Sequence, residues 1–346
     1  MKINWGVIGC GGIAFRRTIP GLVKSENANL VAVMDTNFEV AKQVQKEFNA
    51  SYAFDNVEDL LNLDEIDAVY IATPVFCHKE QVLKAASKKK HILLEKPMGL
   101  TVADSIEIKE FCEKQGVKLG VGLMMRFNSL HQQIRDIISS GQLGEIVSMR
   151  CQFTCWYPEI EGAWRQKKAL SGGGALMDMG VHCIDLLRFV SSLEAKEVVS
   201  LQSNQLFSYE VEAASSVIMK MENGALAYVD ASFNIPDEVS VSKLEIYLTG
   251  GSIFLKGSLA QDEAGEGTLI LTDGLKGYDA QQNRKTEEST RLLAKDGNLY
   301  TKEIEAFENA IINGTEPPVT AEDAIKAQQI VEAAYRASDE GKIIKL

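Results

Sequence analysis

Short apolar runs alternate with amphipathic segments along the first 122 residues. The apolar runs predict strands at 3–8, 29–34, 51–54, 67–73, 91–94 and 117–122, and the segments between them predict helices at about 13–23, 40–48, 57–61, 80–88 and 102–114. Strands that alternate with helices are typical of a parallel sheet with helices on both faces. We therefore predict an α/β, doubly wound domain over residues 1–122, followed by a connecting helix at 127–138.

The hydrophobic period changes to two from Glu145 onward, which predicts an open, mostly antiparallel sheet in a second α/β domain at 123–346. Strands are expected at 147–155, 217–221, 225–233 and 243–248, and Asn223-Gly224 predicts a hairpin between two of them. One face of this sheet should carry a helix, and the other face is expected to bind a second subunit in a homodimer or homotetramer. Residues 260–286 are polar and glycine-rich, which predicts an edge or a mobile loop. The C-terminal helices at 301–340 are expected to pack back on the first domain.

One predicted helix is apolar nearly all round and follows Ser171-Gly172-Gly173-Gly174. Such a helix belongs in a core, yet Asp178, His182 and Asp185 form a polar stripe along it. Burying Asp178 and His182 without partners would cost several kcal/mol. We therefore expect them to face a cleft.

The first predicted strand leads into the pattern Gly9-Cys10-Gly11-Gly12-Ile13-Ala14, and a helix follows. In a Rossmann dinucleotide site, Gly9 would permit the tight turn, Gly11 the close approach of a pyrophosphate, and Ala14 the packing of helix on strand. The second strand ends in Asp35, whose carboxylate would accept hydrogen bonds from the adenosine ribose and repel a 2′-phosphate. This predicts NAD rather than NADP; the alternative for Asp35 is a helix cap.

Lys96 lies where the buried strand at 91–94 ends, within Glu95-Lys96-Pro97. The carboxyl ends of parallel strands border the ligand crevice, and desolvation there lowers the pKa of a lysine towards the range of an acid/base group. We therefore expect Lys96 to lie close to bound substrate, the alternative being a surface lysine after a core strand.

Composition excludes several classes of protein. The 36 basic and 48 acidic residues give a net charge of −12, which disfavours nucleic acid and membrane surfaces as partners. The six cysteines include no C-x-x-C pair, and the four histidines show no zinc-type spacing with them, so we expect reduced thiols, a cytoplasmic location and no metal. No apolar run reaches the length of about 18 residues that a membrane span needs.

These separated signals together resemble the Gfo/Idh/MocA family of oxidoreductases. The matching segments are the glycine loop, Ile71-Ala72-Thr73-Pro74 with His78, Glu95-Lys96-Pro97, Arg126-Phe127, Trp164-Arg165, the segment from Gly172 to His182 with Asp185, the segment 300–307 and the final helix from Glu322. The resemblance implies NAD(P)-dependent hydride transfer on a sugar or cyclic polyol, with Lys96, Asp178 and His182 as the catalytic group. It also implies a cis Lys96–Pro97 bond. The family commonly has Asn directly after Thr-Pro, where this chain has Val75, so a side-chain contact to the cofactor at that position stays open.

The resemblance also implies the binding residues. Cofactor contacts are expected from Gly9, Gly11, Gly12, Ile13, Ala14, Asp35, Thr73, Pro74, His78, Glu95 and Lys96, and substrate contacts from Lys96, Arg126, Trp164, Arg165, Asp178 and His182. For Arg165 and Arg126 the alternative is a salt bridge to a carboxylate.

The nicotinamide carries out the redox chemistry, so the protein orients the reactants and moves a proton. We assign the proton to His182, because an imidazole ordinarily titrates near neutral pH; Asp178 would anchor the sugar or orient the ring. Lys96 would stabilise a developing alkoxide, and the reverse assignment, with Lys96 as proton carrier, stays open. Two alternatives for the whole chain are an NAD-dependent glycoside hydrolase and a nucleotide-sensing regulator without turnover.

Overall fold

The computed structural model describes residues 2–272, 280–281 and 289–346, and in them the chain forms two compact units. The first unit comprises Met1–Met124, Gly162–Gly173 and Asn298–Gln329, and the second comprises Met125–Glu161, Gly174–Gly297 and Ile330–Leu346. The expected boundary near residue 122 lies close to the first crossing between units. The chain then re-enters the first unit twice. The return at Asn298–Gln329 overlaps the C-terminal helices expected to pack back on the first domain, whereas the return at Gly162–Gly173 was not predicted.

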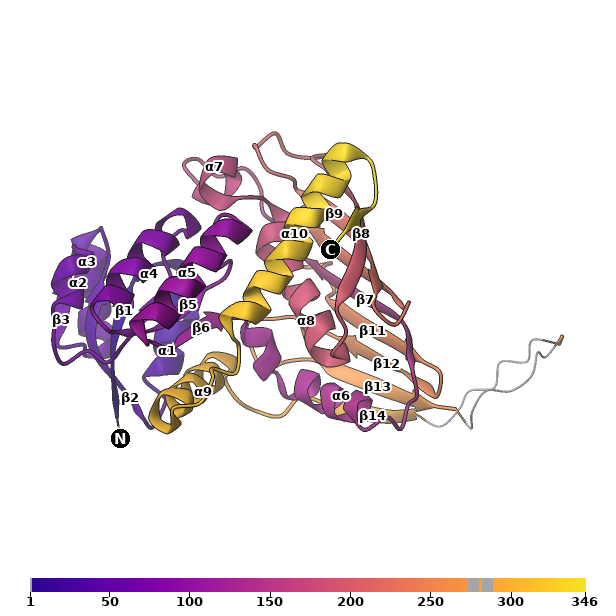
Figure 1. The fold of residues 1–346 in the computed structure, drawn as a ribbon, viewed down its shortest axis with the longest axis horizontal. Coiled ribbons are helices and arrows are strands. Elements are labelled where there is room, and N and C mark those ends of the chain that lie inside the picture. Colours follow the sequence, from indigo (N-terminus) through magenta and orange to yellow (C-terminus); the bar gives the residue numbers. More distant parts are fainter. Residues whose placement is uncertain (1, 273–279, 282–288) are drawn as a thin grey trace. The chain divides into compact units, whose positions relative to one another are not determined.

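The sheet of the first unit has six parallel strands in the order β3-β2-β1-β4-β5-β6 (Figure 1). Their bounds are β1 Ile3–Ile8, β2 Ala28–Met34, β3 Tyr52–Phe54, β4 Ala68–Ile71, β5 His91–Glu95 and β6 Leu119–Gly122. This is the strand order of a Rossmann fold, in which the direction of winding reverses between β1 and β4 and leaves a crevice at the carboxyl ends of those strands. The predicted parallel domain is therefore confirmed.

The helices of this unit begin at short polar caps. Asn37, Asn56 and Thr101 each accept a hydrogen bond from a backbone N–H in the first turn that follows.

The helices of the first unit have the bounds η1 Ala14–Thr18 (a π-helix), α1 Ile19–Leu22, α2 Phe38–Phe48, α3 Val57–Leu61, η2 Val75–Cys77, α4 His78–Ser87, α5 Val102–Gln115, η4 Trp164–Gln166, α7 Lys168–Ser171 and α9 Leu299–Asn313. The helix α10 (Ala321–Glu340) belongs in part to each unit.

The helix α9 completes the core of the first unit. Phe307 is buried against Trp5, Tyr70 and Leu93 of the sheet. A side chain at Gly120 would lie 2.8 Å from the ring of Phe307, so β6 needs a glycine where the helix crosses it. The Trp5 ring also donates a hydrogen bond of 2.9 Å to Glu308. These contacts hold the C-terminal segment on the first sheet.

The second unit contains a nine-stranded sheet in the order β14-β13-β12-β11-β7-β10-β9-β8-β15. The bounds are β7 Ile146–Thr154, β8 Ala195–Ser203, β9 Ala214–Met221, β10 Leu226–Ser232, β11 Lys243–Leu248, β12 Gly251–Lys256, β13 Glu266–Leu271, β14 Ser289–Leu293 and β15 Ile344–Lys345. Only β7 and β10 pair in parallel; the other described pairs are antiparallel, as predicted. Part of the segment expected as an edge or loop is β13, next to the edge strand; residues 273–279 and 282–286 of that segment lie outside the described residues.

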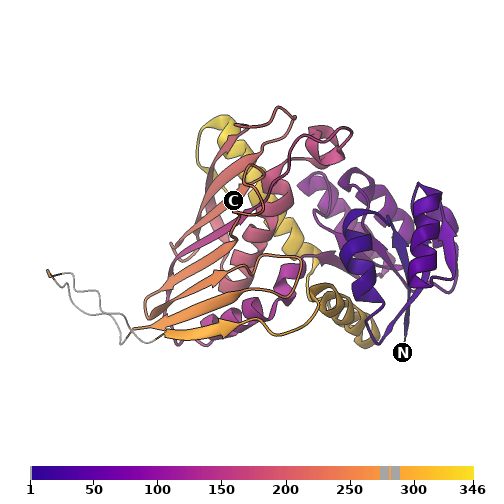
Figure 2. The ribbon, with the colours of Figure 1, turned by 180° about the vertical axis from the view of Figure 1, so that it is seen from behind.

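Helices cover one face of this sheet (Figures 1 and 2). They are α6 Ser129–Ser139, η5 Leu176–Gly180 (a π-helix) and α8 Val181–Ser191; a short η3 helix spans Met124–Phe127. Nearly every residue of η5 and α8 is buried, because they pack directly on β7 and β10. Among the helices described, none has the length and hydrophobicity needed to cross a membrane.

Candidate active site

The glycine loop begins directly after β1. Gly9 has a φ of +89°, and a Cβ there would lie 2.9 Å from the Thr73 side chain and 3.0 Å from the Ala72 carbonyl oxygen. Its N–H donates to Met34 O at the end of β2. Only glycine combines this backbone conformation with this approach, so the turn predicted at Gly9 is built into the packing of three strand ends.

Gly11 and Gly12 are exposed, and a Cβ at either would meet nothing within 4 Å. The π-helix η1 follows, with half-buried Ile13 as its first flanking residue and Ala14 fully buried against the sheet. The first N–H groups of a helix carry a partial positive charge and attract phosphate. The loop thus has the space and the polarity that a pyrophosphate requires.

Asp35 follows β2 beside this loop. Its Oδ2 accepts from Cys10 N at 3.0 Å, and its Oδ1 accepts from Asn37 N at 2.9 Å. The cap of α2 is Asn37, whose side chain accepts from Glu39 N. Asp35 is therefore not the helix cap. Its carboxylate is held at the carboxyl end of β2, where the ribose of a dinucleotide is bound in this fold.

His78 connects the ends of β4 and β5. It is 1% exposed, with Nε2 at 2.9 Å from Thr73 O and Nδ1 at 3.0 Å from Pro97 O. Burial lowers its pKa to about 4, so the ring is neutral and donates to one of these carbonyls at a time. In the structure His78 thus joins the backbone at Thr73, next to Pro74, to the backbone at Pro97. The expected contact of His78 to the cofactor stays a prediction.

Glu95 and Lys96 lie at the carboxyl end of β5. The Tyr70 hydroxyl donates to Glu95 Oε1, the Lys96 N–H donates to Oε2 at 3.2 Å, and the Thr18 hydroxyl donates to the Tyr70 oxygen at 2.9 Å. Lys96 is half-buried, and the Lys96–Pro97 bond is cis, as the resemblance predicted. Burial raises the pKa of the Glu95 carboxyl, while the Tyr70 hydrogen bond and the charges of Lys96 and Arg165 oppose the rise.

Arg165 and Trp164, on η4, are both half-buried, and the guanidinium lies 4.4 Å from the centre of the Trp164 ring. The charge of Arg165 also lowers the pKa of Glu95. The structure thus brings Arg165 into the surroundings of the Glu95–Lys96 corner. Contacts of either residue to substrate stay a prediction.

Asp178 and His182 belong to the second unit. Asp178 is the half-buried residue of the otherwise buried η5, and His182, one turn later on α8, is 5% exposed. Glu212 caps this helix, since its two carboxyl oxygens accept from Gly174 N and Leu176 N, each at 2.9 Å. A Cβ at Gly174 would lie 2.0 Å from Glu212 O, which explains the glycine-rich approach.

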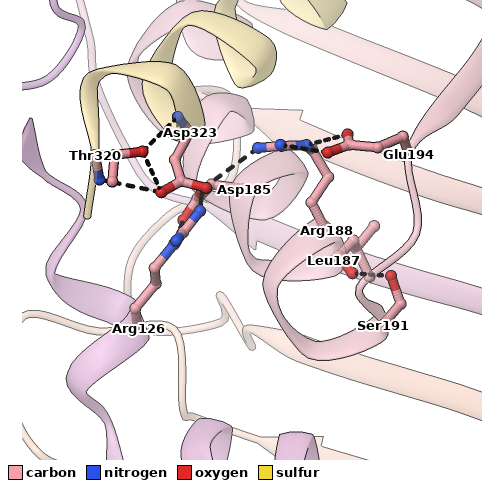
Figure 3. A network of polar contacts seen from close by, with 8 residues as sticks. All are labelled: Arg126, Asp185, Leu187, Arg188, Ser191, Glu194, Thr320 and Asp323. Atoms are coloured by element: carbon pink, nitrogen blue, oxygen red, sulfur yellow. Dashed lines mark hydrogen bonds and ion pairs between the residues drawn. The ribbon is translucent and has the colours of Figure 1, made fainter. Parts of the chain in front are cut away.

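Arg126 and Asp185 form a buried salt bridge within the second unit (Figure 3). Asp185, the third residue of the polar stripe predicted along this helix, is 2% exposed and hydrogen-bonded to Arg126. Of the three residues in this stripe, Asp185 thus forms an ion pair, and Asp178 and His182 are the two that were expected to face a cleft. For Arg126 the structure shows the salt bridge that was the alternative to a substrate contact.

Two buried titratable residues near the Glu95 corner, Tyr70 and Glu303, were not predicted from the sequence. Tyr70 is fully buried in the apolar run of β4, and Glu303 of α9 is 2% exposed. A signal existed for Glu303, because it lies four residues before Phe307, on the buried stripe of an amphipathic helix. A charged residue on such a stripe is unusual.

A Rossmann sheet with an open glycine loop, joined to a second α/β unit, defines the class of dinucleotide-dependent oxidoreductases. The family described as an oxidoreductase family with an NAD-binding Rossmann fold matches residues 3–123, and the GFO/IDH/MocA C-terminal domain matches residues 131–254. The chain belongs to the Gfo/Idh/MocA family of oxidoreductases.

Three relatives illustrate the similarity. A 1,5-anhydro-D-fructose reductase of Ensifer adhaerens is 27% identical over 344 residues, 99% of this chain and 98% of the relative. A D-xylose 1-dehydrogenase (NADP(+)) of Haloferax volcanii is 26% identical and covers 99% of each chain. The crystal structure of an aldose-aldose oxidoreductase from Caulobacter crescentus, complexed with glycerol, has a TM-score of 0.89, 23% identity and complete coverage of both chains.

Proposed function

We propose that this protein transfers a hydride between NAD(H) and a hydroxyl or carbonyl carbon of a sugar or cyclic polyol. The observation that carries the proposal is the corner at the carboxyl ends of β1, β4 and β5, where the open glycine loop, Thr73 and the cis Glu95-Lys96-Pro97 turn come together in the first unit. This is the crevice in which a Rossmann fold binds its ligand. Two relatives described above are named a 1,5-anhydro-D-fructose reductase and a D-xylose 1-dehydrogenase, and both names support a sugar as the substrate class.

The residues fit the cofactor. Gly9, Gly11, Gly12, Ile13 and Ala14 would hold the pyrophosphate, and Asp35 would accept from the ribose hydroxyls and repel a 2′-phosphate, which supports NAD over NADP. Bound there, the cofactor supplies the hydride acceptor or donor. In this proposal Lys96 donates a hydrogen bond to the reacting oxygen and His182 takes or returns its proton, while Asp178 orients the sugar or the imidazole.

The assembly is proposed from the face of the second sheet opposite α6 and α8. Hydrogen-bonded neighbours place Val199, Ile218, Tyr228, Arg150, Glu245 and Phe254 in one row across six strands. The row mixes apolar and aromatic side chains with an Arg150 that stacks 5.5 Å from Tyr228. Val199 and Ile218 of this row are exposed apolar side chains, and exposed apolar surface of a sheet marks a candidate protein interface, which supports docking of a second copy. The proposal also includes a cytoplasmic location, which was expected because the cysteines show no disulfide-type pattern.

A panel of aldoses, keto-sugars and cyclic polyols, assayed at 340 nm with NAD(H) and with NADP(H), tests the function. Turnover of at least one sugar or polyol, faster with NAD(H), is the expected result. Release of phenol from aryl glycosides without accumulation of NADH would establish the hydrolase instead. Firm NAD binding with no turnover of any compound would favour the regulator.

A further inference from the structure

The helix α9 carries a buried carboxyl group, that of Glu303, which interacts electrostatically with Glu95. Glu303 lies one turn before Phe307, which is packed on the sheet near Tyr70 and Leu93. The negative charge of Glu95 raises the pKa of Glu303, and both carboxyl groups raise the pKa of the Tyr70 hydroxyl. Gly122 of β6 lies against the Glu95 carboxyl, where a Cβ would be 3.3 Å from its atoms. Both carboxyl groups therefore lie where α9 crosses the sheet, Glu95 against Gly122 and Glu303 one turn from the Phe307 that packs on Gly120.

In the described residues, the Glu303 carboxyl group forms no hydrogen bond that would stabilise a negative charge. Its side chain is 2% exposed, and within the described residues neither carboxyl oxygen has a hydrogen-bond partner. An unpaired buried carboxylate costs several kcal/mol, so the group keeps its proton instead. Burial and repulsion by Glu95 accordingly raise the pKa of Glu303 well above its ordinary value.

Glu95 is the member of the pair that carries the negative charge. Two donors, the Tyr70 hydroxyl and the Lys96 N–H, point at its two oxygens, one at each. The groups that act on the pair are Tyr70 from β4, Lys96 directly after β5 and Arg165 from η4. The pair thus carries one negative charge opposite two cations, and a third positive charge would favour ionisation of the second carboxyl.

Oxidised NAD has a positively charged nicotinamide ring, and the ring is neutral in reduced NAD. We propose that Glu303 and Glu95 are a proton-exchanging pair, which holds one proton when the crevice binds reduced NAD and releases that proton to solvent, in part or in full, when it binds oxidised NAD. No covalent bond to the cofactor forms; the O–H bond of Glu303 breaks and the proton goes to the buffer. The inference rests on the proposed function, since it requires the nicotinamide at the carboxyl end of β5.

Calorimetric titration of the full chain with NAD+ and with NADH, each in two buffers of different ionisation enthalpy at one pH, counts the protons exchanged. Wild-type protein should release more protons with NAD+ than with NADH, and the affinity for NAD+ relative to NADH should rise with pH, by at most about tenfold per unit. Glu303→Gln should abolish both effects, and Glu303→Met, which removes the buried polar group, provides a second variant if the amide disturbs folding.

Two controls locate the source of the protons. Glu308→Gln alters a buried carboxyl of the same helix that is hydrogen-bonded to Trp5 and Ser25, and it should keep the difference between NAD+ and NADH. His182→Gln should keep it as well. Equal proton numbers for the two cofactor forms in the wild type, or a difference that survives in both Glu303 variants, would overturn the inference. Failure of both forms to bind would instead overturn the proposed function.

Discussion

Asp185 holds the Arg126 guanidinium by two hydrogen bonds, of which the bond from Nε to Oδ2 is 2.9 Å long. Both side chains are buried, at 8% and 2% exposure. Asp185 also lies 3.9 Å from Arg188, whose guanidinium pairs with Glu194 (Figure 3). The network fixes α8 to the segment that begins the second unit, and α8 carries His182.

Asp185→Leu should lower the free energy of unfolding by about 3–5 kcal/mol, because it leaves two buried guanidinium groups without their shared carboxylate. Chemical denaturation followed by circular dichroism measures this. The matched control is Glu266→Gln, which breaks an exposed ion pair with Arg291 and should change stability by about 1 kcal/mol or less. Equal effects of the two substitutions would show that the buried pair does not stabilise the unit.

Gly9→Ala and Gly11→Ala should separate folding from cofactor binding. At Gly9 the positive φ alone costs about 1–3 kcal/mol for alanine, and its Cβ would also collide with Thr73. At Gly11 the Cβ enters open space, so stability should stay within about 0.5 kcal/mol of the wild type. Its methyl group would occupy the pyrophosphate position, so NAD affinity should fall. Thermal unfolding and cofactor titration of both variants distinguish these outcomes; unchanged NAD affinity in Gly11→Ala would contradict the assigned loop.

Asp35→Asn should relax the preference for NAD over NADP. Removing one negative charge near a 2′-phosphate is worth about 1–4 kcal/mol, which corresponds to roughly tenfold or more in the ratio of kcat/KM values. Asp67→Asn is a suitable control, because Asp67 also accepts from a backbone N–H, that of Asn4, at the opposite end of the strands. An unchanged cofactor ratio in Asp35→Asn would remove this residue from cofactor selection.

Lys96→Met and His182→Gln should each reduce turnover by about 10²–10⁴-fold while leaving the dissociation constant for NADH nearly unchanged. Stopped-flow turnover and fluorescence titration of NADH provide the two measurements. Full activity in both variants would end the assignment of these residues to the proton step. Loss of NADH binding in Lys96→Met would make the lysine a cofactor residue first.

His131 should make folding sensitive to acid. It is fully buried, between Met125 O and the Ser258 hydroxyl, and burial lowers its pKa from 6.5 to about 4. The unfolded chain therefore binds more protons between pH 6.5 and 4, and stability falls as the pH falls through that window, by about 3 kcal/mol in total. His131→Gln should reduce this dependence in unfolding titrations, and the similarly buried His78, whose pKa is also lowered to about 4, should account for a remaining part. An identical slope in the variant would contradict the assignment.

The local pattern of the sequence determined the first unit. Strands, crossovers and the glycine loop follow from residues close together in the chain, so period and turn chemistry were sufficient to predict the Rossmann sheet, the turn at Gly9 and the strand end at Lys96. The second sheet was predicted less completely. The periodicity identified β7, β9, β10 and β11 but not β8 or β12, because an apolar segment without regular alternation is ambiguous in sequence.

The partnerships of the charged residues were decided only by the tertiary structure. Nothing near Arg126 in sequence indicates Asp185 as its partner, and nothing near Glu95 indicates that Glu303, on a helix from the far end of the chain, interacts with its charge. The reason is physical: a strand or helix period is a property of neighbouring residues, whereas the free energy of a buried charge depends on whichever groups the fold brings around it.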